Sequence, residues 1–250
     1  MRTAWRYLPA LMMAAALAGP AQAGWLQKLF GFGQDEPQAE AAPAGASTAL
    51  DAGTIGAGLK QALEIGAGRV VERLGRVDGF NADPQVHIPL PDELAKLRSA
   101  LDRVGMAGKL DELELELNRA AEAAAPRAGE LFVAAIRELT LDDALAIYRG
   151  PDDAATRYLR DKMAGPLSAE LLPVVEQSLD QVGAARTYET VVGRYNDLPF
   201  VPPVQADLDS WVVARGMDGL FFYLAREEAA IRHDPVKRST ELLRKVFSGQ

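Results

Sequence analysis

The chain has 250 residues, of which 48% are hydrophobic and 25% are charged, the composition of an ordinary globular protein. It contains no cysteine, which excludes disulfides, thiolate catalysis, thiolate zinc sites and an acylated N-terminal cysteine. The 27 basic residues against 35 acidic ones give a net charge of -8, so we expect no nucleic-acid partner.

The first 23 residues have the pattern of a secretory signal peptide. Arg2 and Arg6 precede an apolar run over residues 8–18, and Ala21 to Ala23 supply the small residues of a cleavage site. The apolar run is too short to span a bilayer as a helix. We therefore expect cleavage after Ala23 and a periplasmic protein, with secretion as the alternative.

Residues 24–48 are predicted to combine a short apolar segment with a disordered linker. Trp25, Leu29 and Phe30 lie at roughly helical spacing, which suits either a frayed or core-docked end or a helix with weak membrane-surface or partner contact. Residues 34–47 are rich in Ala and Pro and contain no aromatic or β-branched residue. Such a segment cannot bury enough apolar surface to order itself, so we interpret it as a flexible tether.

From residue 49 onward the sequence predicts one helix after another. Ile55, Leu59, Leu63, Val70 and Leu74 fall on one helical stripe, with four glycines beside it between positions 56 and 68. Each glycine inside a helix costs about 1 kcal/mol relative to alanine. We therefore expect these small residues to permit close contact with another helix.

Residues 78–91 are the one stretch expected to be extended, because Pro84 favours a turn and Pro89 and Pro91 interrupt helical hydrogen bonding. Pro91 also suits the first position of a helix that runs to about residue 104. Residues 111–117 alternate acids with leucines, as a strand does. Glu and Leu are good helix formers, however, and the apolar stripe continues past the alternation, so we predict a helix.

Further helices are predicted to begin at Pro126, Thr140 and Ser168. Proline is favoured in the first turn, and threonine is a good N-cap for a short helix that ends at Gly150. Residues 196–205 are rich in proline and are expected to form a loop.

The C-terminal part is predicted to supply aromatic side chains to the core, Trp211 and Phe221 among them. Asp234 and the proline after it separate this helix from the last one. The expected fold is all-α: a single compact bundle-like domain of roughly eight to ten short helices over residues 49–250, preceded by the signal peptide and the tether.

No familiar catalytic or metal-binding motif is present. His87 and His233 are the only histidines and are not at ligand spacing, and the sequence lacks HExxH, GxSxG, Walker and SxxK patterns. We expect no metal ion and no cofactor. Asp78, Asn81 and Asp83 offer oxygens to a cation, but their spacing departs from an EF-hand loop, and an Asx-type turn also explains them.

Polar residues from two segments form the candidate ligand-binding or structural cluster: Asn118, Arg119, Glu122, Asp152, Asp153, Thr156 and Arg157. Asp152 and Asp153 suit a helix N-terminus, and Asp153 can pair with Arg157 at i+4; alternatively the two carboxylates do acid–base work. We expect Arg119 to form a buried pair with Asp152 or Asp153, or to anchor an anionic group of a ligand.

Several of these segments together resemble a known family. They are Gly24-Trp25-Leu26, Asp78-Gly79-Phe80, Ile88-Pro89-Leu90-Pro91, the stretch 118–122, the block 150–160, Asp218-Gly219-Leu220-Phe221 and Asp234-Pro235. In this order, from about Leu50 to Phe247, the chain resembles the bacterial exported family known as domain of unknown function 4197. The resemblance implies an exported helical protein and supplies no catalytic residues.

The leading expectation for function is a non-enzymatic periplasmic binding or interaction module. Its partner would be a protein or a small apolar or anionic ligand. One alternative is a hydrolase-like enzyme that uses carboxylates such as Asp152 or Asp153. The other is association with the envelope surface through Trp25, Leu29 and Phe30.

Overall fold

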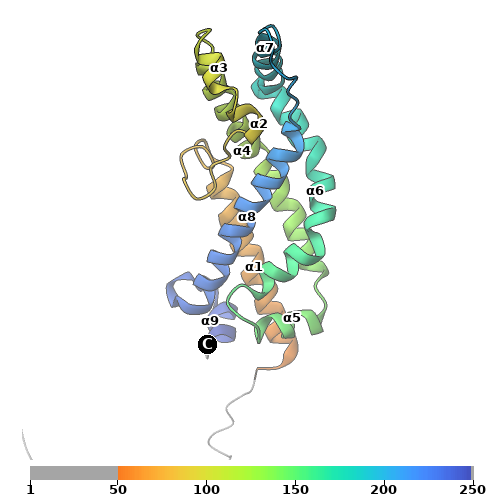
Figure 1. Cartoon of the computed structure of the whole chain (residues 1–250). Helices are drawn as coiled ribbons and strands as arrows, with labels where there is room; N and C mark the ends of the chain where they lie inside the picture. The colour runs from red at the N-terminus through yellow and green to blue at the C-terminus, as the bar shows by residue number, and fades with distance from the viewer. Residues whose placement is uncertain (1–49, 249–250) are drawn as a thin grey trace, which may run out of the picture. The chain divides into compact units, whose positions relative to one another are not determined.

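The computed structural model describes residues 50–248, and over these residues it contains helices and no strand. The all-α prediction is confirmed for this part of the chain. The predicted signal peptide, apolar segment and tether lie outside it. The helices, shown in Figure 1, are α1 (Ala52–Leu74), α2 (Asp92–Ala95), α3 (Arg98–Asp102), α4 (Ala107–Glu138), α5 (Leu141–Tyr148), α6 (Ala154–Val182), α7 (Ala184–Asn196), α8 (Leu208–His233), the 3₁₀ helix η2 (Pro235–Lys237) and α9 (Glu241–Phe247).

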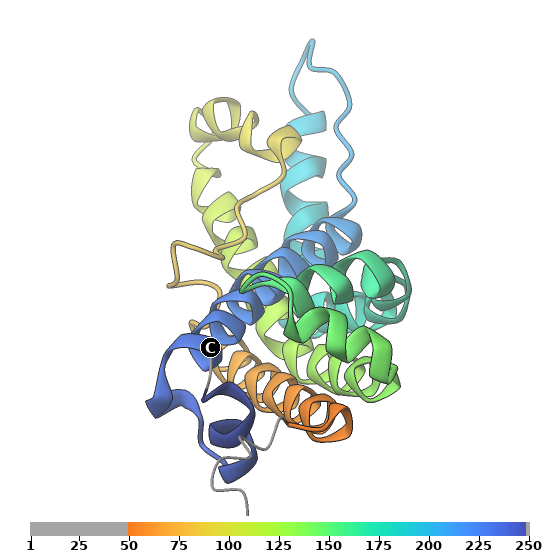
Figure 2. The same ribbon diagram turned by 90° about the horizontal axis from the view of Figure 1, so that it is seen from below.

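Four long helices form the body of the domain. Each packs against the next in the cyclic order α1, α4, α6, α8 and back to α1, so chain neighbours among them are also neighbours in space. The shorter helices lie at the two ends: α5 and α9 pack on α1, whereas α3 and α7 pack on α4 (Figures 1 and 2). The apolar stripes predicted from the sequence face inward, and their side chains make up one continuous buried core.

Two of the helices, α4 and α6, are longer than expected because prolines lie inside them. Pro126 does not begin a helix, since α4 continues through it, and Ser168 lies within α6 together with Pro166 and Pro173. Each internal proline removes one helical hydrogen bond and strains the preceding turn. The helices nevertheless continue because the apolar residues on both sides of each proline are buried in the same core.

Close helix contact occurs as predicted at Gly56, Gly58 and Gly66 of α1, whereas a methyl group placed on Gly68 would meet nothing within 4 Å. A methyl group placed on Gly58 would lie 2.5 Å from Val246 Cγ2 of α9, and one on Gly66 would touch Glu227 and Ile231 of α8. Gly58 is therefore a position where a side chain would force α9 away from α1.

Residues 78–91, which we call the strap, cross from the end of α1 to the start of α2 without forming a helix. The prediction of an extended chain is wrong for the first part of the strap, where backbone hydrogen bonds form turns up to Val86. Phe80, Val86, Ile88 and Leu90 of the strap are buried in the core. The single helix expected after the strap is divided into α2 and α3. Tight i to i+3 hydrogen bonds around Leu97 break the α-helical pattern between them.

The aromatic prediction is confirmed for Phe221 and only in part for Trp211. Phe221 is 2% exposed, and its ring packs edge-on against Phe132 with 5.2 Å between centroids. Trp211 is half-buried, and its indole N–H donates to the Pro89 carbonyl at 2.9 Å.

Replacing Phe221 with alanine should lower the free energy of unfolding by about 3 to 5 kcal/mol, because it leaves a cavity beside Phe132. Phe200→Ala is the matched control: the ring is fully exposed, and the change should stay within about 0.5 kcal/mol. Denaturant unfolding measures both values. Equal losses for the two variants would contradict the placement of Phe221 in the core.

Candidate functional site

A polar stripe on α4 holds the strap. Glu114, Asn118 and Glu122 follow one another at intervals of four residues, so they lie on one face of the helix. That face meets the strap, whose backbone N–H and C=O groups have no regular helical partners. The stripe therefore supplies hydrogen-bond partners that the strap needs when its side chains are buried.

Glu122 binds the first part of the strap. One carboxylate oxygen accepts the backbone N–H groups of Phe80 and Asn81, both at 3.1 Å, and the other pairs with Arg119 Nη1 at 2.7 Å. The Glu122 side chain is 5% exposed. Arg119 Nη2 also reaches Asp78 at 2.8 Å, which places a buried carboxylate, a guanidinium and a surface carboxylate in one chain of contacts.

Asn118 binds the later part of the strap as a backbone group would. Its Oδ1 accepts from Ile88 N–H at 2.9 Å, and its Nδ2 donates to the Ile88 carbonyl at 2.8 Å. Asn118 is fully buried. An aspartate here would lose the second hydrogen bond, so the amide is the side chain that suits both partners.

Helices α1 and α8 hold the strap from the other side. Tyr223 OH donates to Asp83 at 2.5 Å, and Arg73 pairs with the same carboxylate at 2.8 Å. Burial raises the pKa of Asp83, but the hydrogen bonds from Tyr223 and Arg73 outweigh it, and the net pKa lies below the ordinary value. Asp83 also accepts Gln85 N–H, the Asx-type turn considered above.

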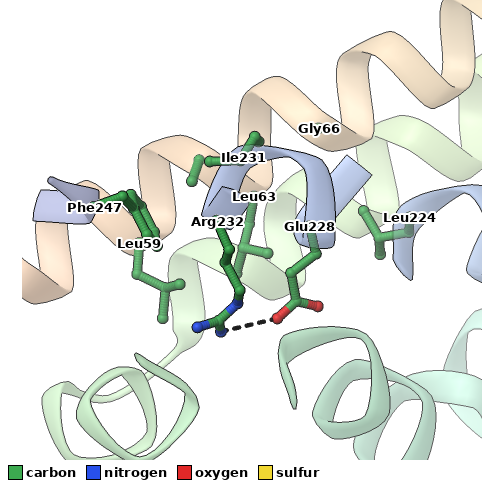
Figure 3. Close-up of a pocket in the computed structure, with 9 residues that line it drawn as sticks. Leu59, Leu63, Gly66, Leu224, Glu228, Ile231, Arg232 and Phe247 are labelled. Carbon is green, nitrogen blue, oxygen red and sulfur yellow. Dashed lines mark hydrogen bonds and ion pairs between the residues drawn. The ribbon is translucent and has the colours of Figure 1, made fainter. Parts of the chain in front are cut away.

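A second polar group joins α8 to the turn between α5 and α6 (Figure 3). Glu228 and Arg232, one turn apart on α8, pair at 3.1 Å with side chains that are 4% and 3% exposed. Glu228 accepts the N–H groups of Ala155 and Thr156 at 2.9 and 3.0 Å. Arg232 donates to the carbonyl of Ile147 at 2.9 Å.

This pair serves two helix ends at once. The carboxylate lies at the N-terminus of α6, and the guanidinium lies at the C-terminus of α5, where it also reaches the carbonyl of Tyr148. Each charge therefore has the sign that the helix dipole favours. The sequence analysis missed both residues, although an acid and a base at i, i+4 in an apolar helix were a signal for such a pair.

The seven candidate residues separate into two places. Asn118, Arg119 and Glu122 lie at the strap, whereas the block that begins at Asp152 lies at the start of α6. About 19 residues of α4 separate Arg119 from the end of that helix, which is about 30 Å of helix. The expected pairing of Arg119 with Asp152 or Asp153 is therefore wrong: Arg119 binds Asp78 and Glu122 instead.

The acids of the α6 block are surface groups. Asp152 pairs with His233 at 2.8 Å, and Asp153 pairs with Arg157 at 2.8 Å as predicted, with side chains between 36% and 67% exposed in these pairs. Asp153 is the N-cap of α6, but its side chain makes no capping hydrogen bond. Glu228 accepts the backbone N–H groups of the first turn of α6 in its place, and it also accepts a hydrogen bond from the Thr156 hydroxyl.

Two apolar cavities in the core are small. The one beside Glu228 and Arg232, drawn in Figure 3, has a volume of about 10 Å³. The other, lined by alanines of α4 and by Met217, has about 20 Å³. Neither volume exceeds the space of about one water molecule, so neither holds an apolar ligand.

The surface has two larger hollows of different charge. A groove of about 620 Å³ borders the strap, where Arg73 and Arg76 face Asp78 and Asp83, so its charges nearly balance. A groove of about 450 Å³ lies between α6, α7 and the start of α8. We call the second one the acidic groove, and its carboxylates are Glu176, Asp180, Glu189, Asp207 and Asp209.

The acidic groove contains no compensating cation. None of its five carboxylates forms an ion pair within the described residues, although Asp207 caps α8 through Ser210 N–H. Burial and the nearby charges of Asp207, Glu176 and Asp180 raise the pKa of Asp209. The groove therefore carries a negative field that a positively charged group would relieve.

Over residues 50–248 no three His, Asp or Glu side chains converge as a metal site requires. None of the helices in this part of the chain combines the length and apolarity needed to cross a membrane.

Comparison with models of known protein families shows to which family the chain belongs. The model of the family described as "Protein of unknown function (DUF4197)" matches residues 49–248. The chain belongs to this family. No curated protein and no solved structure gives a significant match.

Four of the segments that carried the resemblance to DUF4197 contribute to the two polar groups. Residues 78–80 and 88–91 are the two ends of the strap, and residues 118–122 are the part of α4 that binds them. The block 150–160 contains the α5–α6 turn that Glu228 and Arg232 hold. In this chain these motifs therefore contain residues that join the strap to α4 and the α5–α6 turn to α8.

Glu228→Ala should lower the free energy of unfolding by about 3 to 5 kcal/mol, because Arg232 stays buried without its carboxylate and two amides lose their acceptor. Arg232→Met in the same background should recover part of the loss. Asp153→Ala, which breaks an exposed pair, is the control and should cost at most about 1 kcal/mol. Denaturant melts of the wild-type protein, the two single variants at 228 and 232, their double variant and Asp153→Ala test this, and strictly additive losses at 228 and 232 would refute the coupling.

Proposed function

We propose that this DUF4197 protein is an exported, non-enzymatic interaction module whose acidic groove binds a positively charged segment of a partner protein. The observation that carries the proposal is the groove itself: about 450 Å³ of surface hollow, five carboxylates and no ion pair among them. By contrast, the acids within the strap and on the α4 stripe are each paired with an arginine or a histidine: Asp78, Asp83, Glu114 and Glu122.

The way the buried polar groups are used supports binding rather than catalysis. Glu122 and Glu228 are the buried carboxylates, and both are occupied by backbone N–H groups and by an arginine. A general acid or base needs an oxygen that reaches a substrate. The exposed Asp152 and Asp153 are paired at the surface and are not brought together on a cleft.

An aromatic side chain lies on the connection that leads into the groove. Phe200 is fully exposed in the loop between α7 and α8, and Ala206 and Asp207 at the end of that loop line the groove. Exposed aromatics are frequent anchors in protein interfaces, where charged residues surround them. The combination favours a protein partner with both basic and apolar residues over a small anionic ligand.

Export is the second part of the proposal. Its support is the signal pattern of residues 1–23 followed by a domain of ordinary globular composition. A partner outside the cytoplasm would meet the groove at the pH and ionic strength of the cell's surroundings, and both change the strength of a carboxylate surface.

The exported form should begin at Gly24. Intact-mass measurement on protein from the periplasmic fraction should show the loss of residues 1–23. Ala23→Phe places a bulky residue at the cleavage site and should leave the longer form. A periplasmic protein of full mass, or retention of residues 8–18 in the membrane fraction, would contradict export with cleavage.

An oligolysine peptide should bind the mature protein at low salt and lose affinity as salt is added. The double variant Asp180→Asn/Asp209→Asn should weaken binding about tenfold, since two exposed charge contacts are together worth about 1.4 kcal/mol. Glu138→Gln/Asp142→Asn removes the same charge at the α5 end and is the control. Isothermal titration calorimetry compares them, and equal weakening by both double variants would show that net charge, not the groove, is responsible.

A further inference from the structure

His87 of the strap contacts a hydrogen-bond acceptor with each of its ring nitrogens. Nδ1 lies 2.9 Å from the carbonyl oxygen of Asn81, and Nε2 lies 2.9 Å from Glu114 Oε1. The other oxygen of Glu114 accepts Leu90 N–H at 3.3 Å. The ring thus connects the two halves of the strap with the polar stripe of α4.

The number of protons in this arrangement follows from the chemistry of the groups. A carbonyl oxygen only accepts hydrogen bonds, and so does an ionised carboxylate, whereas a neutral imidazole carries one N–H. Both contacts are hydrogen bonds only when one additional proton is present, either on the imidazole or on Glu114. Without that proton, one nitrogen lone pair faces an oxygen lone pair, and one of the two contacts becomes repulsive.

The other charged groups near the ring are paired with one another: Arg119 of α4 with Asp78 and Glu122, and Arg73 of α1 with Asp83. Helix α8 contributes the neutral Trp211 to the strap at Pro89, and Arg215 stacks on the indole ring with its Cζ 4.4 Å from the ring centroid. Glu114 is therefore the charged group that contacts His87, and the ring is 30% exposed, so solvent protons reach it.

We propose that His87 and Glu114 form a proton-dependent latch that fastens the strap to α4. With the additional proton, the His87 ring is held both by Asn81 within the strap and by Glu114 of α4. When the proton leaves, the ring keeps one partner and the segment around Leu90 loosens. The rest of the strap stays bound through Asn118 and Glu122, so the change is local and does not unfold the domain.

The number of protons that each form of the latch holds fixes the direction of its pH dependence. The latched form holds one more proton than the loosened form, so acid favours latching and rising pH favours loosening. Histidine is the side chain that ordinarily changes its charge between about pH 5 and pH 8, so the comparison is made across that range.

Hydrogen exchange of the strap amides tests the latch in the mature protein. Relative to the Leu117 amide inside α4, protection of the Leu90 amide should fall about tenfold between pH 5.5 and pH 7.5, after correction for intrinsic exchange. His233→Gln removes a histidine that pairs with Asp152 at the surface, and this control should leave the fall unchanged.

Glu114→Gln provides the decisive comparison. The glutamine oxygen can still accept from Leu90 N–H, while its amide donates to Nε2 of a neutral His87 whose Nδ1–H donates to Asn81. Both contacts then need no additional proton, so protection at Leu90 should be high at both pH values and nitrogen NMR should show the Nδ1–H tautomer. A fall that persists in Glu114→Gln, or no fall in the wild-type protein, would overturn the latch.

Discussion

The packing of the strap against the polar stripe of α4 is the interaction on which this fold depends. The strap buries apolar side chains from a segment that forms no helix, so its backbone groups enter the core without regular partners. Asn118 and Glu122 supply those partners from one helical face. The apolar residues of the strap can fill the space between α4 and α8 only because these two side chains form hydrogen bonds with the backbone of the strap.

The same principle operates at the other end of the domain, where Glu228 and Arg232 satisfy the turn between α5 and α6. In both places a buried charge binds backbone rather than solvent or a reacting group, and its removal leaves several groups without partners. Uncompensated charge is instead concentrated on the surface of α6, α7 and α8. There burial and the neighbouring carboxylates raise the pKa of Asp209, and burial raises the pKa of Glu116 on α4, which contacts Thr187 of α7. In the function proposed above, binding of a cationic segment would relieve this charge repulsion.

Local signals in the sequence predicted many of the elements. Thr140 caps α5 in a full capping box, the prolines of the strap prevent helix there, and the stripe of α1 faces the core. The prediction failed at Pro126 and Ser168 because a rule for isolated helices was applied to helices held on both sides by one core. The sequence pattern correctly showed that each internal proline costs a helical hydrogen bond, and the burial of the neighbouring apolar side chains offset this cost.

By itself the sequence determined the helical class, the absence of helix in the strap, the family and the residues of the two polar groups that the motifs contain. Only the tertiary structure decided which charged side chains form pairs. Arg119 and Asp153 have opposite charges and were expected to pair, but the length of α4 separates them. Each pairs instead with a residue close to it in the sequence, Arg119 with Glu122 and Asp153 with Arg157. Glu228 lies more than 70 residues beyond the backbone N–H groups it accepts, and Arg232 lies as far beyond the carbonyl groups to which it donates. The carboxylates of the acidic groove come from three helices. The helical period fixes which side chains are neighbours within one helix, but it does not fix the distances between side chains of different helices. Sites built from several helices therefore cannot be predicted from the period alone.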